Sequence, residues 1–277
     1  MPLELVTIPC LQDNYTYLLH DPVSRKTAVV DVPEVAPILK ELLRREWLLS
    51  DILITHHHDD HIQGVDELRG VTGARVWGAE ADRQRLPRLD WSLWAGDEVR
   101  VGRESGTVID VPGHTRGHIA FHFPDSGLAF TGDSLMAGGC GRLFEGTPAE
   151  MWSSLTKLAA LPPATVICSG HEYTASNLRF AATIEPDSPA LAASTARVAE
   201  EIALFLEEGV ELADEIGGGL AGGEAAVDVD RAGAGKDVDV PSAAQAGRGR
   251  GVAEDRFDRG TAGQFAHEEG QEDGTEA

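Results

Sequence analysis

Four short polar segments each follow an apolar stretch of the sequence and each carries histidine or aspartate side chains. The longest, THHHDDH at residues 55–61, comes directly after Ile52–Ile54. The others are PGHTRGH at 112–118, TGDS at 131–134 and SGHEY at 169–173. Imidazole and carboxylate groups are the usual protein ligands of zinc and related divalent ions. The first segment is the strongest signal and each of the other three alone is weak. Side chains that follow strands gather at one edge of a layered α/β protein, so the four together predict one metal site.

The elements that must position these segments are visible in the sequence up to about residue 210. Two stretches, residues 35–49 and 149–161, have apolar side chains at the spacing of a helix. Other short runs are rich in β-branched residues and are bounded by Gly, Pro, Asp or Ser, which is typical of strands. A chain that mixes strands and helices in this way predicts a layered α/β fold. The expected strands are residues 16–21, 27–33, 51–57, 74–80, 106–114, 119–127, 128–134 and 164–171.

The composition excludes several classes of function. The chain has 277 residues, of which 46 are acidic and 23 are basic, and its formal net charge is −23. Such an acidic chain repels phosphate backbones, so nucleic acid is not an expected partner. No apolar run approaches the roughly 18 residues that span a membrane, and the opening residues lack a secretory signal. The cysteines, Cys10, Cys140 and Cys168, lie far apart and predict reduced thiols. We therefore expect a cytoplasmic protein, with a monomer as the default assembly.

Negative charge and glycine are concentrated toward the C-terminal end. Residues 200–277 hold 20 of the 46 acidic and 6 of the 23 basic side chains, and residues 211–277 hold 14 of the 31 glycines. A segment with so little apolar material cannot offset the entropy cost of ordering its backbone, which predicts disorder. We therefore expect a metal-binding domain at 1–170, the start of a helical C-terminal region at 171–210, and an atypical, acidic, Gly-rich tail at 211–277.

The polar segments and their surroundings resemble a known family over roughly residues 1–195. THHHDDH, PGHTRGH, TGDSLMAGGCGRLFEG and SGHEYTASNLRFA are similar, in order and spacing, to signatures of the metallo-β-lactamase superfamily. Within it they resemble the glyoxalase II group, the hydroxyacylglutathione hydrolases, and LQDNYTYLL resembles that group's N-terminal strand. The resemblance implies a metallo-β-lactamase-like four-layer αβ/βα sandwich. Its metal site would lie at one edge between two sheets, followed by a smaller helical C-terminal region.

The resemblance also implies a ligand set for two divalent metal ions. Zinc is the expected metal, with iron or manganese as alternatives, because all three accept mixed histidine and carboxylate ligands. A hydroxide that bridges the two ions beside Asp60 and Asp133 would be the nucleophile, since a bound metal lowers the pKa of water to about 7. One metal would be held by His56, His58 and His114, the second by Asp60, His61 and His171, and Asp133 would bridge both.

Three further residues are implied as substrate contacts. In the glyoxalase II group a basic residue, here Arg142, and the tyrosine of GHEY, here Tyr173, contact glutathione. Phe144 occupies an aromatic position where the group often has tyrosine, so a hydroxyl contact is absent here. The implied substrate is a glutathione thioester, S-D-lactoylglutathione. Its hydrolysis to glutathione and D-lactate serves methylglyoxal detoxification.

Two alternative functions remain open on the sequence. A mononuclear iron persulfide dioxygenase of the same fold needs only a His-His-Asp ligand set, whereas the presence of Asp60, His61 and His171 favours the hydrolase. A metal-binding protein impaired in substrate binding is the second alternative. It is considered because the group's C-terminal segment carries basic residues that grip glutathione, whereas this chain becomes acidic and Gly-rich there.

Two more histidines lie within the motifs. His57 sits between two expected ligands, so its side chain should point away from them, because neighbouring side chains in an extended backbone face opposite ways. For His118 the sequence leaves two interpretations open: it orients a metal ligand through a hydrogen bond, or it makes a buried polar contact.

Overall fold

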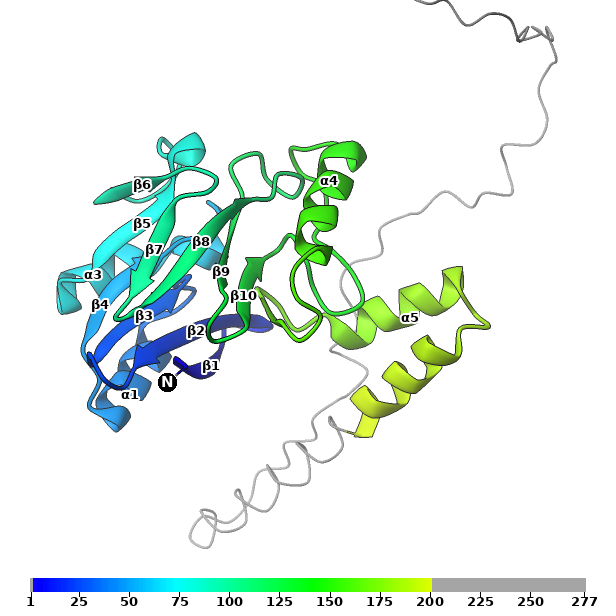
Figure 1. The fold of residues 1–277 in the computed structure, drawn as a ribbon, viewed down its shortest axis with the longest axis horizontal. Coiled ribbons are helices and arrows are strands. Elements are labelled where there is room, and N and C mark those ends of the chain that lie inside the picture. The colour runs from blue at the N-terminus through cyan, green and yellow to red at the C-terminus, as the bar shows by residue number, and fades with distance from the viewer. Residues whose placement is uncertain (1, 201–277) are drawn as a thin grey trace, which may run out of the picture. The chain divides into compact units, whose positions relative to one another are not determined.

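Two β-sheets with helices on their outer faces make up residues 2–200, the part of the chain that the computed structural model describes (Figure 1). The predicted tail at 211–277 lies outside these residues. The first sheet has the strand order β1-β2-β3-β4-β5-β6 and the second has the order β11-β10-β9-β8-β7. The strands are β1 Glu4–Cys10, β2 Asn14–Asp21, β3 Lys26–Val30, β4 Leu49–Leu53, β5 Arg75–Ala79, β6 Trp91–Leu93, β7 Glu98–Val101, β8 Glu104–Asp110, β9 Ile119–Phe123, β10 Leu128–Gly132 and β11 Val166–Ser169.

The strand directions bring the four polar segments to one edge. In the second sheet β8 and β10 are both antiparallel to β9, and β11 is parallel to β10. The C-terminal ends of β8, β10 and β11 therefore point the same way. In the first sheet the first polar segment follows β4, and Thr55 of that segment accepts a backbone hydrogen bond of 3.0 Å from Ile119 of β9. This bond joins the two sheets at the edge where the segments lie.

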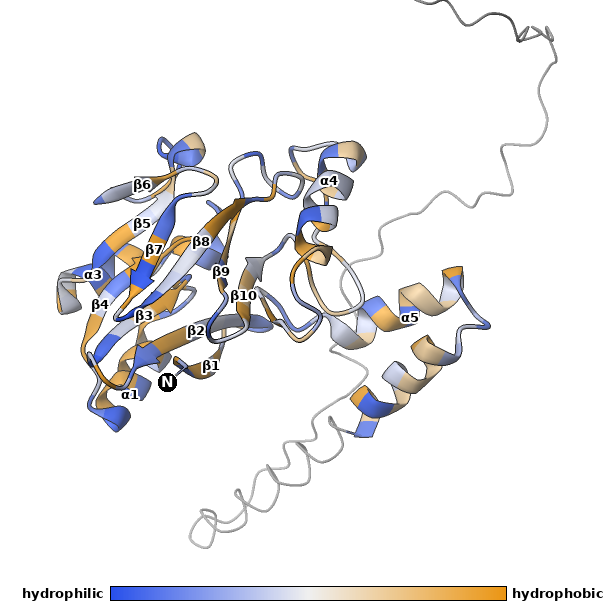
Figure 2. Ribbon diagram, viewed as in Figure 1, coloured by the Kyte–Doolittle hydropathy of each residue, from blue (hydrophilic) through white to orange (hydrophobic). Residues whose placement is uncertain are grey.

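Apolar side chains fill three layers of core. The cluster between the two sheets includes Leu19 of β2 and the large aromatic side chain of Phe121 in β9. On the outer face of the first sheet, α1 (Val35–Arg45) and α3 (Val65–Thr72) bury their apolar sides against it, and α4 (Pro148–Ala159) covers the second sheet. The strands accordingly carry the most hydrophobic stretches in Figure 2. The four-layer αβ/βα sandwich expected from the sequence is confirmed.

The two predicted helices form, with shifted ends. The helix expected at 35–49 ends at Arg45, because Glu46 adopts a left-handed conformation (φ 57°) that closes the last turn. Leu49 then begins β4. The helix expected at 149–161 is Pro148–Ala159, and it begins with reciprocal hydrogen bonds between Thr147 and Glu150, a capping box.

Three strands were missed by the sequence pattern: β1, β6 and β7. β6 has 3 residues, and β7 reads EVRV, so charged side chains occupy half of its positions. Strands as short as β6 and β7 carry little pattern of their own, and their pairing with neighbouring strands stabilises them. Other predicted strands were too long: the one at 106–114 ends at Asp110 and the one at 128–134 ends at Gly132. Beyond those ends the chain turns into the polar segments.

The predicted helical region that begins at 171 is described only in part. It contains α5 (Thr174–Ile184) and a further helical stretch at 189–200. Across residues 2–200, none of the helices combines the length and the apolar character needed to cross a membrane.

The core between the sheets gives a first prediction. Replacing Phe121→Ala should lower the free energy of unfolding by about 3–5 kcal/mol, because the side chain is fully buried (0% exposed) and its loss leaves a cavity. Phe180→Ala is the matched control, since Phe180 on α5 is 65% exposed. Urea denaturation of the three proteins measures the difference. Equal destabilisation by the two substitutions would contradict the assignment of Phe121 to the core.

Candidate metal centre

The first polar segment presents three histidines from one short turn. The chain leaves β4 at Leu53, and His58 precedes the single-turn helix α2 (Asp59–Ile62). His56 and His61 are buried, whereas His58 is half-buried. The helical turn brings His61 back toward His56, so that their ring centroids lie 4.2 Å apart.

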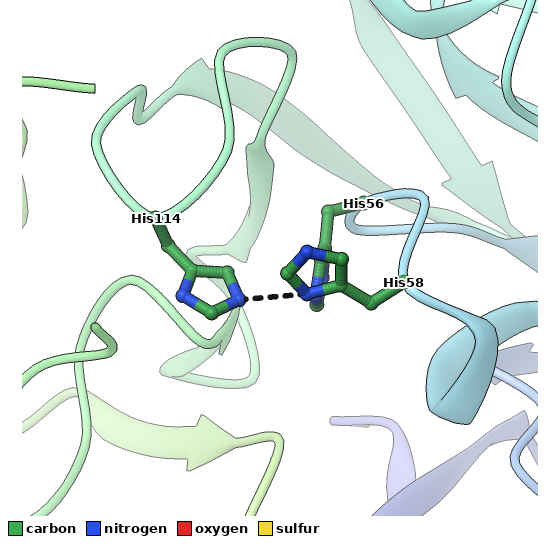
Figure 3. Close-up of side chains that lie close together, drawn as sticks. All are labelled: His56, His58 and His114. Carbon is green, nitrogen blue, oxygen red and sulfur yellow. Dashed lines mark hydrogen bonds between the residues drawn. The ribbon is translucent and has the colours of Figure 1, made fainter. Parts of the chain in front are cut away.

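Three ring nitrogens converge at one point of this edge (Figure 3). His56 Nε2 lies 3.1 Å from His58 Nδ1, and His114 Nε2 lies 2.9 Å from the same atom. His114 comes from the loop after β8, so the second sheet completes a set that the first sheet begins. These are the three residues expected to hold one metal, and the structure brings them together.

The other expected set also converges. His61 Nε2 and His171 Nε2 are 3.3 Å apart, and Asp60 Oδ2 lies 3.4 Å from the His171 nitrogen and 3.8 Å from the His61 nitrogen. His171 follows β11, which places its ring opposite α2 across the edge. A cation among these atoms would be held by two imidazoles and one carboxylate.

Asp133 lies between the two sets. Its Oδ2 is 3.3 Å from His114 Nε2 and 3.4 Å from His171 Nε2, and its Oδ1 is 3.5 Å from His61 Nε2. The backbone around it is crowded, since a Cβ at Gly170 would come within 2.3 Å of Asp133 Oδ1. The carboxylate therefore contacts both sets, as a bridging group would.

The arrangement of the donor groups suits a bound cation better than it suits hydrogen bonds among the groups themselves. Asp133 Oδ1 is buried and has no hydrogen-bond partner among residues 2–200. A buried carboxylate oxygen without a donor is costly, and a positive ion beside it removes that cost. His114 Nδ1 donates to the Arg142 carbonyl at 2.7 Å, so His114 Nε2 presents a lone pair to the space shared with His56 and His58. His and Asp clusters of this kind suit divalent metal ions.

The two sets differ in electrostatics. Burial and the neighbouring imidazoles lower the pKa of His56, and burial also lowers the pKa of His58 and His114, so these rings stay neutral. Burial acts in the same direction on His61 and His171, but there the carboxylates outweigh it. Asp31 raises the pKa of His61, and hydrogen bonds to Asp133 and Asp60 raise that of His171 to about 10.

The carboxylates of the centre are stabilised in their charged form. A hydrogen bond from His171 holds the pKa of Asp60 well below its usual range. Burial opposes ionisation of Asp133, but the hydrogen bond from His171 and the charges of His61 and His171 lower its pKa to about 2. Both groups are therefore anionic at neutral pH, the form in which a carboxylate binds a metal.

Hydrogen bonds on the far side of the rings fix their orientation. Asp31 accepts from the backbone N–H and the hydroxyl of Thr55, both at 2.8 Å, and lies 2.8 Å from His61 Nδ1. The Asp13 carboxylate lies 2.9 Å from His171 Nδ1. Asn14 Nδ2 donates to the Asp60 carboxylate at 3.1 Å. Such outer contacts set which ring nitrogen faces a metal.

Sequence reasoning missed Asp13, Asn14 and Asp31 as site residues. Asp31 directly follows β3, which reads KTAVV, and has a left-handed conformation (φ 59°). An aspartate directly after a strand was a signal by which the sequence could have indicated a site residue. Asp13 and Asn14 lie at the turn between β1 and β2, where such residues are expected for the turn alone. No local pattern distinguishes the two roles.

The structure decides between the two interpretations of His118. Its Nδ1 lies 3.1 Å from the Ile119 carbonyl, so that nitrogen carries the proton and donates it. The backbone N–H of Asp133 then donates to His118 Nε2 at 3.2 Å. Burial lowers the pKa of His118 to about 3, which keeps the ring neutral. His118 thus positions Asp133, the residue between the two sets, and also stacks on His56 at 4.6 Å.

A cavity of about 730 Å³ opens beside the donor groups. Arg142, Phe144 and Tyr173, the residues expected to contact substrate, all line it. The Tyr173 ring stacks on His171 with centroids 4.9 Å apart, and the Arg142 guanidinium lies 5.8 Å from the Phe144 ring. Cys140 also lines the cavity and is exposed.

Known proteins resemble this chain in sequence and in fold. The model of the metallo-beta-lactamase superfamily matches residues 21–171. A hydroxyacylglutathione hydrolase of Cereibacter sphaeroides is 71% identical over 191 residues, which are 69% of this chain and 75% of that protein. A hydroxyacylglutathione hydrolase of Fuscovulum blasticum is 66% identical over 200 residues, 72% of this chain and 78% of that protein.

A solved structure, TTHA1623 in a di-iron-bound form, has a TM-score of 0.52 and is 28% identical, over 61% of this chain and 92% of that one. The chain belongs to the metallo-β-lactamase superfamily and, within it, to the hydroxyacylglutathione hydrolase family.

Proposed function

We propose that this chain is a binuclear metal-dependent thioester hydrolase that converts S-D-lactoylglutathione to glutathione and D-lactate. The observation that carries the proposal is the contact of Asp133 with both sets of donors beside a cavity large enough for a tripeptide thioester. The names of the relatives, at 66% and 71% identity, support the substrate class.

Two metal ions are proposed, with zinc as the expected metal. His56, His58 and His114 would hold one ion and Asp60, His61 and His171 the other, with Asp133 shared. Bound divalent ions at such a centre make hydroxide available at neutral pH and stabilise a developing oxyanion. The related structure of TTHA1623, in a di-iron-bound form, supports the number two and keeps iron as an alternative.

The side chains of the cavity would bind and orient the substrate. Arg142 is exposed at the cavity wall, and its guanidinium suits the carboxylates of glutathione. Tyr173, stacked on His171, places a phenolic group next to the proposed second set. Glutathione leaves as a thiolate, a good leaving group, so the reaction needs little assistance from a general acid.

The metal requirement gives a decisive experiment. Asp133→Ala should reduce the bound metal from two ions per chain to one or none, and kcat for S-lactoylglutathione should fall by a factor of about 10³. The reason is that both sets lose the carboxylate that joins them. Elemental analysis of the purified protein, paired with an assay of thiol release, measures both quantities.

Asp59→Ala is the matched control, because Asp59 lies next to Asp60 and lines the cavity, but its side chain is exposed. It should keep two ions and near-normal turnover. An Asp133→Ala protein with two tightly bound ions would defeat the proposed bridge. One iron per wild-type chain, with oxygen uptake on glutathione persulfide, would instead establish the dioxygenase alternative.

The substrate contacts give a separate prediction. Arg142→Gln should raise KM for S-lactoylglutathione about tenfold and leave kcat within about threefold, because it removes a charge that binds the distant carboxylates rather than the thioester. Steady-state kinetics measures both constants, and Leu143→Ala, the neighbouring exposed side chain that does not line the cavity, is the control. An unchanged KM for Arg142→Gln would remove Arg142 from the substrate site.

A further inference from the structure

A cluster of four charged or titratable side chains lies outside the donor sets and does not line the cavity. We define it as the His57–Glu145 cluster: His57, Asp82, Arg85 and Glu145. His57 Nδ1 lies 2.9 Å from Asp82 Oδ2, which ends the short 3-10 helix η1 (Glu80–Asp82). Arg85 bonds the Asp82 carboxylate and also Glu145, with one contact to Glu145 of 3.1 Å. As expected from the sequence, His57 points away from its ligand neighbours.

Asp82 is the buried centre of this cluster. Its side chain is 1% exposed, whereas those of Glu145 and Arg85 are 24% and 38% exposed. A buried carboxylate needs hydrogen-bond partners within the protein, and Arg85 and His57 supply them. The loop that carries His114 lies against it, because a Cβ at Gly117 would come within 2.2 Å of Asp82 Cγ.

Glu145 contacts three separate segments of the chain. It bonds Arg85, accepts a hydrogen bond of 2.9 Å from the backbone N–H of Arg116, and lies 3.6 Å from His57 Nε2. Arg116 belongs to the loop of His114, and His57 to the loop of His56 and His58. The bond from Arg85 holds the pKa of Glu145 at about 2, so the group is anionic at neutral pH.

Glu145 is next in the chain to a segment of the cavity wall, so its contacts also hold that segment. The residue follows the segment 140–144, which contributes Cys140, Arg142 and Phe144 to the cavity wall. Backbone bonds attach this segment to the His114 loop on both sides of Glu145: Phe144 N–H to the His114 carbonyl at 3.2 Å and Gly146 N–H to the Gly113 carbonyl at 3.0 Å. The Glu145 side chain adds the link from this segment to the first polar segment and to η1.

We infer that Glu145 is a positioning residue. Its carboxylate fixes the cavity segment 140–144 relative to the loop of His114 and to the loop of His56 and His58. This inference rests on the proposed function, because it assigns to that segment the binding of the glutathione part of the substrate. Loss of the Glu145 carboxylate should loosen the wall that carries Arg142 and Phe144. The donor groups themselves should stay in place. Asp31, Asp13 and Asn14 hold His61, His171 and Asp60 from other elements. His114 Nδ1 lies 2.7 Å from the Arg142 carbonyl of this segment, and the backbone bond from Phe144 to the His114 carbonyl, which the substitution leaves intact, keeps the two together.

The test uses Glu145→Gln in the metal-loaded, full-length protein. The variant should bind glutathione about tenfold more weakly and show a KM for S-lactoylglutathione raised by about the same factor, with kcat within about twofold. Hydrolysis of S-methyl thioacetate, a thioester without the tripeptide, should be unchanged, and so should the metal content. Isothermal titration with glutathione, steady-state kinetics and elemental analysis supply the readouts.

Arg85→Gln is the second variant, because it removes the partner of Glu145 from the other side. It should weaken glutathione binding at least as much, because Arg85 also bonds the buried Asp82. The double variant should lose less than the sum of the two single losses, since both single substitutions break the contact between Arg85 and Glu145. Glu41→Gln is the matched control: Glu41 pairs with Arg44 and Arg45 on α1 and does not line the cavity. It should leave glutathione binding unchanged.

The outcomes separate the inference from the proposed function. A wild-type protein that neither binds glutathione nor hydrolyses its thioester overturns the proposed function itself. A functional wild type with unchanged glutathione binding in Glu145→Gln overturns the inference alone. A variant that loses metal, or that loses kcat on both thioesters equally, would show that Glu145 supports the fold or the donor sets rather than the cavity wall.

Discussion

The structure at this edge depends on the Asp133 carboxylate, which is held between two groups of imidazoles. One of its oxygens has no hydrogen-bond donor within the described part of the chain, residues 2–200. A buried anion in that position is stable only where positive charge surrounds it. The two sheets meet this requirement together, because the segment after β4 supplies His61 and the segment after β11 supplies His171, the two imidazoles whose pKa is raised. The same edges supply the other donors: His56 and His58 follow β4, His114 follows β8, and Asp133 follows β10. The centre therefore requires both sheets, since neither sheet alone carries a complete set of donors.

The groups around this carboxylate are held in their orientations by hydrogen bonds. His118 accepts the backbone N–H of Asp133 through a ring kept neutral by burial, and Asp31 holds both Thr55 and His61. Oriented contacts of this kind reduce the freedom of the donors before any ion binds, so the cost of ordering them is met during folding. The cavity wall has a separate support in the His57–Glu145 cluster. Donor groups and substrate wall are thus positioned by different side chains that share the same loops.

Much of this arrangement was predictable from the sequence, and the failures have physical reasons. The eight expected strands and two expected helices form, and the four polar segments meet at one edge. The segments were predictable because each combines metal-binding side chains with a preceding apolar strand. β6 and β7 were not, because 3 or 4 residues with few apolar side chains depend on pairing for their structure.

The sequence by itself determined the types and spacing of the donors and the layered α/β class, since both follow from local residue patterns. Only the tertiary structure decided which atoms face one another: that Asp13 orients His171 and Asn14 orients Asp60, that His118 positions Asp133, and that Glu145 reaches His57. These pairs join residues distant in the chain, 158 positions apart for Asp13 and His171. Their contact depends on sheet register and loop packing, which bring together groups that no local pattern relates.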